Sequence, residues 1–236
     1  MYMKHNLAHP VEKISLWPTH MFKFRYRDWP YDKKKIIDCI RAEEQKQEKD
    51  IDSNVALGVK TGGLKESKFN FLQKCSEEYP VIEKLSEFFS EAVANVVLQA
   101  LPSIDEHLGL PKHVKNINPL IYESWYHITN SGGAHATHCH PGASWAGIFY
   151  VQSSECKMNN NNGVNRWFNT ESNKGPGDLG SMWWNADCLY GIDADEGTLI
   201  LFPAWMWHDA TPYIGEEDRI VIAFNSVVLN GDHKGS

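Results

Sequence analysis

Three histidines stand within six positions of the segment HATHCHPGASWAGIFYVQ, just before an apolar run. On an extended segment, residues i and i+2 point to the same side, so His138 and His140 share a face while His135 faces the opposite side. Two imidazoles at this spacing can bind one metal ion, and a third ligand must come from elsewhere in the chain. His208, which ends the apolar segment GTLILFPAWMWH, is the candidate. The pattern predicts a metal site formed by His138, His140 and His208.

Arg219 is the second residue that could do chemistry. It begins the otherwise apolar segment RIVIAFNSVV, eleven residues after His208. If this segment follows His208 in a hairpin, the guanidinium lies near the metal and can form a two-pronged pair with a carboxylate. The alternative is a surface arginine that pairs with one of the acidic residues 216–218, an interaction that contributes little stability.

Two alternatives to a catalytic metal stay open for the histidines. A polar loop could hold them as a hydrogen-bonded pair. They could also bind a structural zinc, whose site should be closed and four-coordinate, whereas a catalytic metal keeps open positions.

The segments that must position these residues change character near residue 117. Before it, DWPYDKKKIIDCIRAEEQKQEKD and YPVIEKLSEFFSEAVANVVLQAL repeat apolar residues at helical spacing, and Pro80 suits a first helical turn. After it, LIYESWYHI, WAGIFYVQ, GTLILFPAWMW and DRIVIAFNSVV are short, β-branched and aromatic. We therefore expect a mainly β protein: a double-stranded β-helix (a cupin-like jelly roll) with N-terminal helices packed outside it.

The length of 236 residues fits a single domain. We divide it into a helical N-terminal part, 1–116, and a jelly-roll core, 117–230. Residues 153–190 contain NNNNG and ESNKGPGDLG and are interpreted as a polar insertion in that core. This insertion is either a lid over the site or a plain surface loop.

Composition excludes several other functions. The net charge of −7 argues against nucleic acid as the main partner. The sequence contains no apolar run of about 18 residues and no signal-peptide pattern, so no membrane contact and a cytoplasmic location are expected. The five cysteines show no CxxC spacing and are expected to be reduced thiols. A homodimer stays open.

The motifs together resemble a known family. HCHPGASWAGIFYV, GTLILFPAWMWHDATPY and RIVIAFNSV occur in order over roughly residues 117–230. They are similar to the H-x-H-P, FPxWxxH and Arg…FN segments of the phage- and marine-bacterium-type 2-oxoglutarate/Fe(II) oxygenases. The resemblance implies an enzyme that binds iron through His138, His140 and His208 and holds the far carboxylate of 2-oxoglutarate with Arg219. Such an enzyme would use O₂ to oxidise a small molecule or side chain, with release of succinate and CO₂.

Three further residues are expected to hydrogen-bond the 2-oxo acid because they lie on strands expected to face the pocket: Tyr126, Tyr150 and Asn225. Several tryptophans could also form the wall of an aromatic pocket for the substrate. They are Trp145, Trp183, Trp184, Trp205 and Trp207.

The sequence departs from the wider oxygenase superfamily at two positions. The third ligand is His140 where Asp or Glu is usual in the facial triad for non-haem Fe(II). Val221 stands two residues after Arg219, where a serine is expected. Two alternatives follow: a three-histidine cupin-type dioxygenase that does not use 2-oxoglutarate, with Arg219 holding a substrate carboxylate, and a non-catalytic metal-binding jelly-roll domain.

Overall fold

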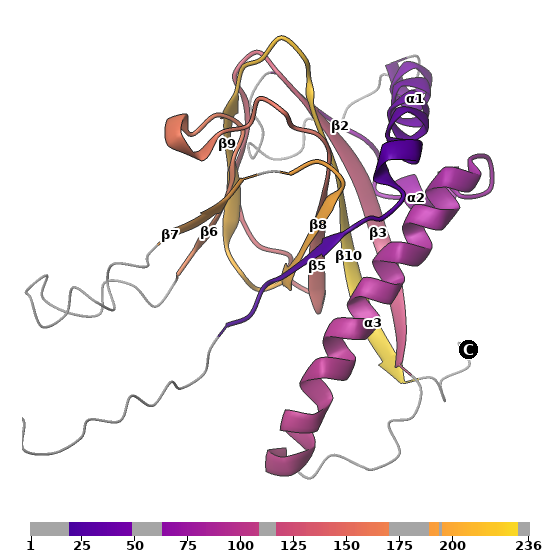
Figure 1. Ribbon diagram of the computed structural model, residues 1–236, viewed down its shortest axis with the longest axis vertical. Helices are drawn as coiled ribbons and strands as arrows, with labels where there is room; N and C mark the ends of the chain where they lie inside the picture. The colour runs from indigo at the N-terminus through magenta and orange to yellow at the C-terminus, as the bar shows by residue number, and fades with distance from the viewer. Residues whose placement is uncertain (1–18, 49–62, 109–116, 170–188, 194, 231–236) are drawn as a thin grey trace, which may run out of the picture.

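The computed structural model describes residues 19–48, 63–108, 117–169, 189–193 and 195–230. Two antiparallel sheets face each other, and helices cover the outer face of the larger sheet (Figure 1). The expected jelly roll with packed helices is confirmed.

The larger sheet has six strands and the smaller sheet has four. The larger one runs, in spatial order, through β1 (Phe22–Arg25), β8 (Thr198–Pro203), β5 (Trp145–Gln152), β10 (Arg219–Asn230), β3 (Ile117–Thr129) and β2 (Leu64–Glu66). The smaller one runs through β4 (Gly133–His138), β9 (His208–Tyr213), β6 (Asn165–Phe168) and β7 (Leu189–Ile192). The site described below lies between these two sheets.

The helices are α1 (Trp29–Glu48), α2 (Phe71–Cys75), α3 (Pro80–Leu108) and a 3₁₀ turn, Met158–Asn160. Helix α3 begins at Pro80, whose fixed φ suits the first helical turn. Its apolar stripe packs on the larger sheet, where Phe89 stacks on Phe224 of β10 at a centroid distance of 4.9 Å. Within the described residues, no helix is long and apolar enough to cross a membrane.

Both faces of the larger sheet are buried, which explains the long apolar runs in its central strands β5, β8 and β10. One core lies between this sheet and the helices, and a second lies between the two sheets. Along β3, Tyr126 and Ile128 belong to the helix-side core. Trp125, His127 and Thr129, at alternate positions, line the cavity between the sheets. This alternation decides which residues of β3 can reach a ligand.

The N-terminal part and the expected insertion both contribute strands that the sequence did not predict. β1 and β2 extend the edges of the larger sheet, although residues 1–116 were expected to be helical. β6 lies inside 153–190 and β7 begins inside it, so this segment is not simply an insertion. The strand Asn165–Phe168 begins with polar residues, so its sequence lacks the apolar run that predicted the other strands. The rest of the expected lid, 170–188 with Trp183, Trp184 and Cys188, lies outside the described residues.

Candidate metal centre

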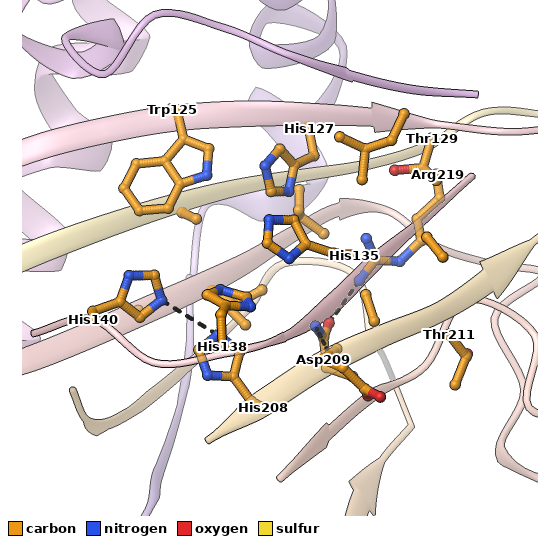
Figure 2. A pocket seen from close by; sticks show the side chains of 18 of the residues that line it. Trp125, His127, Thr129, His135, His138, His140, His208, Asp209, Thr211 and Arg219 are labelled. Carbon is orange, nitrogen blue, oxygen red and sulfur yellow. Dashed lines mark hydrogen bonds between the residues drawn. The ribbon is translucent and has the colours of Figure 1, made fainter. Parts of the chain in front are cut away.

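The smaller sheet brings three histidines together. His138 ends β4 and pairs with His208, which begins β9, while His140 follows in the loop after β4. One ligand atom from each of the three imidazoles can be chosen so that all lie within 4.8 Å of one another. Figure 2 shows the three rings gathered at one end of the cavity. The i, i+2 spacing and the strand pairing thus place the side chains of three separate positions around one point.

Backbone hydrogen bonds determine which nitrogen each histidine presents. Nδ1 of His138 donates to the Ala136 carbonyl at 2.8 Å, and Nδ1 of His208 donates to the Met206 carbonyl at 3.0 Å. A carbonyl can only accept, so each Nδ1 carries the proton and each Nε2 keeps its lone pair, with which His208 accepts a hydrogen bond from Nε2 of His140. These contacts hold the two imidazoles in the tautomer and orientation that metal ligands need.

The spacing between ligand atoms also fits an ion. Nε2 of His140 lies 3.3 Å from Nε2 of His208. Two nitrogens each about 2.1 Å from one ion, at the angles of octahedral or tetrahedral coordination, would be about 3.0 to 3.4 Å apart. The observed separation therefore needs little rearrangement to accept a metal.

Burial keeps these imidazoles neutral. Desolvation, helped by the neighbouring His135, lowers the pKa of His138 to about 4. Desolvation and the adjacent imidazoles lower the pKa of His140 to about 3 and that of His208 to about 2. At neutral pH each ring therefore offers a lone pair instead of a second N–H, as metal binding requires.

His135 does not face away from the other histidines as expected. Its ring centroid lies 4.1 Å from that of His138, and His135 lines the same cavity. The reason is a local irregularity, because the pairing of β4 with β9 shifts register on both sides of His135. A bulge of this kind breaks the two-residue alternation on which the expectation depended.

Arg219 points into the same cavity as the three histidines and is 2% exposed. Its Nε donates to the Gly163 carbonyl at 2.8 Å, and a terminal nitrogen donates to Oδ1 of Asn165 at 2.6 Å. The guanidinium also lies over the Tyr150 ring, 5.9 Å from its centroid. Within the described part of the chain, no carboxylate forms an ion pair with Arg219. A positive charge is thus buried beside the cavity with neutral partners only.

Thr129 lies directly opposite Arg219 in the pairing of β3 with β10. It lines the cavity and is 3% exposed, and its hydroxyl has no hydrogen-bond partner within the described part of the chain. A buried hydroxyl without a partner costs free energy, which a ligand that accepts or donates a hydrogen bond there would recover.

The three residues expected to hydrogen-bond the 2-oxo acid are placed differently from one another. Tyr126 points the wrong way: it lies in the helix-side core against Phe71, 5.2 Å between ring centroids. Tyr150 is fully buried behind Arg219, and its hydroxyl donates to Asn165 at 3.1 Å. Asn225 donates to Glu123 at 2.8 Å and does not line the cavity.

The tryptophans expected to form the wall of a substrate pocket are also placed differently from the prediction. Trp205 and Trp207 are 58% and 44% exposed, and Trp145 packs against the helix-side core. Among the described tryptophans, Trp125 lines the cavity, with its ring centroid 5.8 Å from that of His140.

The sequence reasoning missed several cavity residues, among them Trp125, His127, Thr129 and Asn165. A signal for two of them was present. His127 and Thr129 alternate with the apolar Tyr126 and Ile128, and such alternation puts polar residues on the opposite face from the core. Asn165 carried no comparable signal, because it begins a strand that was interpreted as loop.

Comparison with known proteins agrees with this geometry. Residues 123–225 match the family model described as "Putative 2OG-Fe(II) oxygenase". The match starts within β3 and ends within β10, so it includes the three histidines and Arg219. The resemblance to this family that the sequence motifs suggested is confirmed over this part of the chain. None of the curated proteins matches the chain in sequence.

Solved structures share the fold at low sequence identity. One is a prolyl hydroxylase from Trichoplax adhaerens in complex with a hypoxia inducible factor oxygen degradation domain peptide fragment. It aligns with TM-score 0.53 and 13% identity over 87% of this chain and 82% of that chain. Another is the non-heme α-ketoglutarate dependent epimerase SnoN from nogalamycin biosynthesis, with TM-score 0.51 and 10% identity over 89% of this chain and 76% of that chain. At these identities the likeness establishes the fold alone.

Proposed function

We propose that this chain, which matches the 2OG-Fe(II) oxygenase family over residues 123–225, binds Fe(II) through His138, His140 and His208 and holds 2-oxoglutarate with Arg219. It oxidises a small molecule or a peptide side chain with O₂ and releases succinate and CO₂. The observation that carries the proposal is the buried guanidinium of Arg219, which faces the same cavity as the histidines and, among the described residues, has neutral partners only.

The charge of Arg219 supports a dianionic co-substrate. Burying an arginine without an anion is costly, and a bound carboxylate offsets that cost through charge-assisted hydrogen bonds. Asn165 and the Gly163 carbonyl fix the guanidinium, so it is already oriented when the ligand arrives. Thr129, opposite it, offers a hydroxyl to the same carboxylate. The oxo-acid end would then extend toward the histidines at the other end of the cavity.

Three imidazoles suit the metal of this class, although the usual triad contains a carboxylate. Bound iron would supply the redox chemistry with O₂ that couples substrate oxidation to 2-oxoglutarate decarboxylation. The contribution of the chain is to hold the metal by three neutral ligands and to leave the remaining positions for co-substrate and oxygen. Because no ligand is charged and Arg219 would pair with one carboxylate of the dianion, the filled site would keep a net charge one unit more positive than that of a carboxylate triad.

Uncoupled turnover tests the proposal. The purified protein is incubated with Fe(II), ascorbate and 2-oxoglutarate in air, and succinate is measured, with a metal chelator and heat-denatured protein as controls. We expect succinate release that depends on added Fe(II) and stops with the chelator. If succinate stays at the background level and calorimetry under anaerobic conditions detects no 2-oxoglutarate binding to the Fe(II) form, the proposal is wrong. The three-histidine dioxygenase would then replace it.

A further inference from the structure

A second group of metal-binding side chains lies next to the first. It comprises Glu66 of β2, His127 of β3 and His135 of β4, and one ligand atom from each can be chosen so that all lie within 4.8 Å of one another. None of the three belongs to the set that we propose for iron. Figure 2 shows His127 above His135, which in turn lies above His138.

Strand pairing explains how the three residues meet. Glu66 and His127 are register partners in the antiparallel pair β2–β3, so their side chains lie side by side on one face of the larger sheet. His135 reaches them from the smaller sheet, because the shifted register of β4 turns it inward. The ring centroids of His127 and His135 are 5.4 Å apart. The group therefore spans the two sheets at the edge where β2 lies near β4.

The group has the burial and donor set of a cation site. The Glu66 side chain is 8% exposed and that of His127 is 11% exposed, and a carboxylate oxygen lies 2.6 Å from Nε2 of His127. Nδ1 of His135 contacts the Ala136 carbonyl at 3.2 Å, so Nε2 is the nitrogen of this ring that would bind a metal. Two imidazoles and one carboxylate form a set that binds Fe²⁺, Co²⁺, Mn²⁺ or Zn²⁺.

We propose that Glu66, His127 and His135 form a second divalent-cation site, separate from the one made by His138, His140 and His208. The ion replaces the proton shared by Glu66 and His127. Their 2.6 Å contact then opens by about half an ångström, to the separation of two ligands on one ion. The carboxylate gives this site a negative charge that the three-histidine site lacks. It can therefore bind a cation even when the neighbouring three-histidine site also holds one. This inference does not depend on the proposed oxygenase function.

The test counts bound ions. Purified, metal-free protein is dialysed to equilibrium against Co²⁺, and cobalt per chain is measured by inductively coupled plasma mass spectrometry. The wild type should bind two ions, and Glu66→Gln should bind one. His127→Gln is a second variant that should also bind one ion. Glu217→Gln, the same chemical change at an exposed position, should bind two. Circular dichroism of each variant checks that the fold is retained.

The two metal sites can fail independently. His208→Ala should also leave one ion, and the double variant Glu66→Gln/His208→Ala should bind none. If the wild type binds one ion that Glu66→Gln retains, or if Glu66→Gln and His127→Gln both still bind two, the second site does not exist. If instead Glu66→Gln loses an ion while His208→Ala does not, the second site stands and the three-histidine site is wrong.

Discussion

The hydroxyl of Thr129 and the guanidinium of Arg219 stand opposite each other on β3 and β10, and both face the cavity between the sheets. The wider superfamily places a serine two residues after the arginine, at the position of Val221 in this chain. Here the neighbouring strand carries the hydroxyl. Because register partners in an antiparallel pair are close, Thr129 can serve the same carboxylate that we propose for Arg219.

Replacing Thr129 by valine removes the hydroxyl and keeps the shape. We expect the KM for 2-oxoglutarate to rise at least fivefold, since even an uncharged hydrogen bond contributes about 1 kcal/mol and one to a carboxylate contributes more. The free energy of unfolding should not fall, because this hydroxyl has no partner among the residues that the structure describes. Thr211→Val is the matched control: that hydroxyl bonds to the Val164 backbone, so its loss should lower stability. An unchanged KM in Thr129→Val would contradict the role of Thr129.

Replacing Arg219 by methionine removes the positive charge that we propose binds the carboxylate of 2-oxoglutarate. We expect the KM for 2-oxoglutarate to rise at least tenfold, about 1.4 kcal/mol, the loss of a charge-assisted pair. Fe(II) affinity should change far less, because no ligand is lost. Arg25→Met, at an exposed surface position, should leave both constants unchanged. Steady-state succinate assays and anaerobic Fe(II) titration check this. If Arg219→Met turns over 2-oxoglutarate like the wild type, Arg219 does not bind this co-substrate.

Replacing His208 by alanine should reduce Fe(II) affinity by more than about a hundredfold, since loss of a direct ligand exceeds the effect of losing one of its supporting contacts. Anaerobic titration of Fe(II), followed by calorimetry, measures this. The control is His20→Ala, which removes an exposed imidazole. If His208→Ala binds the ion assigned to this site as tightly as the wild type, His208 is not a ligand.

The two buried tyrosines should respond differently to loss of the hydroxyl. In Tyr126 this group is buried in the helix-side core without a partner, so Tyr126→Phe should leave activity unchanged and should not lower stability. In Tyr150 it donates to Asn165, which holds Arg219, so Tyr150→Phe should lower stability by about 1 kcal/mol and raise the KM for 2-oxoglutarate. Urea denaturation and succinate assays compare the two. If Tyr126→Phe lowers activity and Tyr150→Phe does not, the placement of these two hydroxyls relative to the site is wrong.

Periodicity and motif spacing predicted the long helix and strands, and they also predicted which residues lie at the two ends of the cavity. The stripe of α3 and the apolar runs of β5, β8 and β10 are strong local signals, and the expected hairpin after His208 placed Arg219 near the histidines. The i, i+2 rule also brought His138 and His140 to one side. These predictions succeeded because each depends on neighbours within one element.

Predictions that depended on irregular backbone or on strand faces failed. His135 was misplaced because a register shift in β4 cannot be seen in the sequence. Tyr126 was assigned to the pocket although β3 is buried on both faces, so burial did not reveal which side faces the ligand. β6 looked like loop because Asn165 and Arg166 are polar, and their partners lie 44 and 43 residues away on the same aspartate, Asp209.

The proposed metal ligands all belong to the smaller sheet or its adjoining loop, whereas Arg219 and Thr129 belong to the larger one. A 2-oxoglutarate molecule bound to the metal at one end and to Arg219 at the other would connect the two sheets. Metal and co-substrate then share a thermodynamic linkage: each should bind more tightly when the other is present, by the same factor. The melting temperature should accordingly rise by more with both ligands than the sum of their separate effects, because unfolding would have to break a connection that neither ligand makes alone.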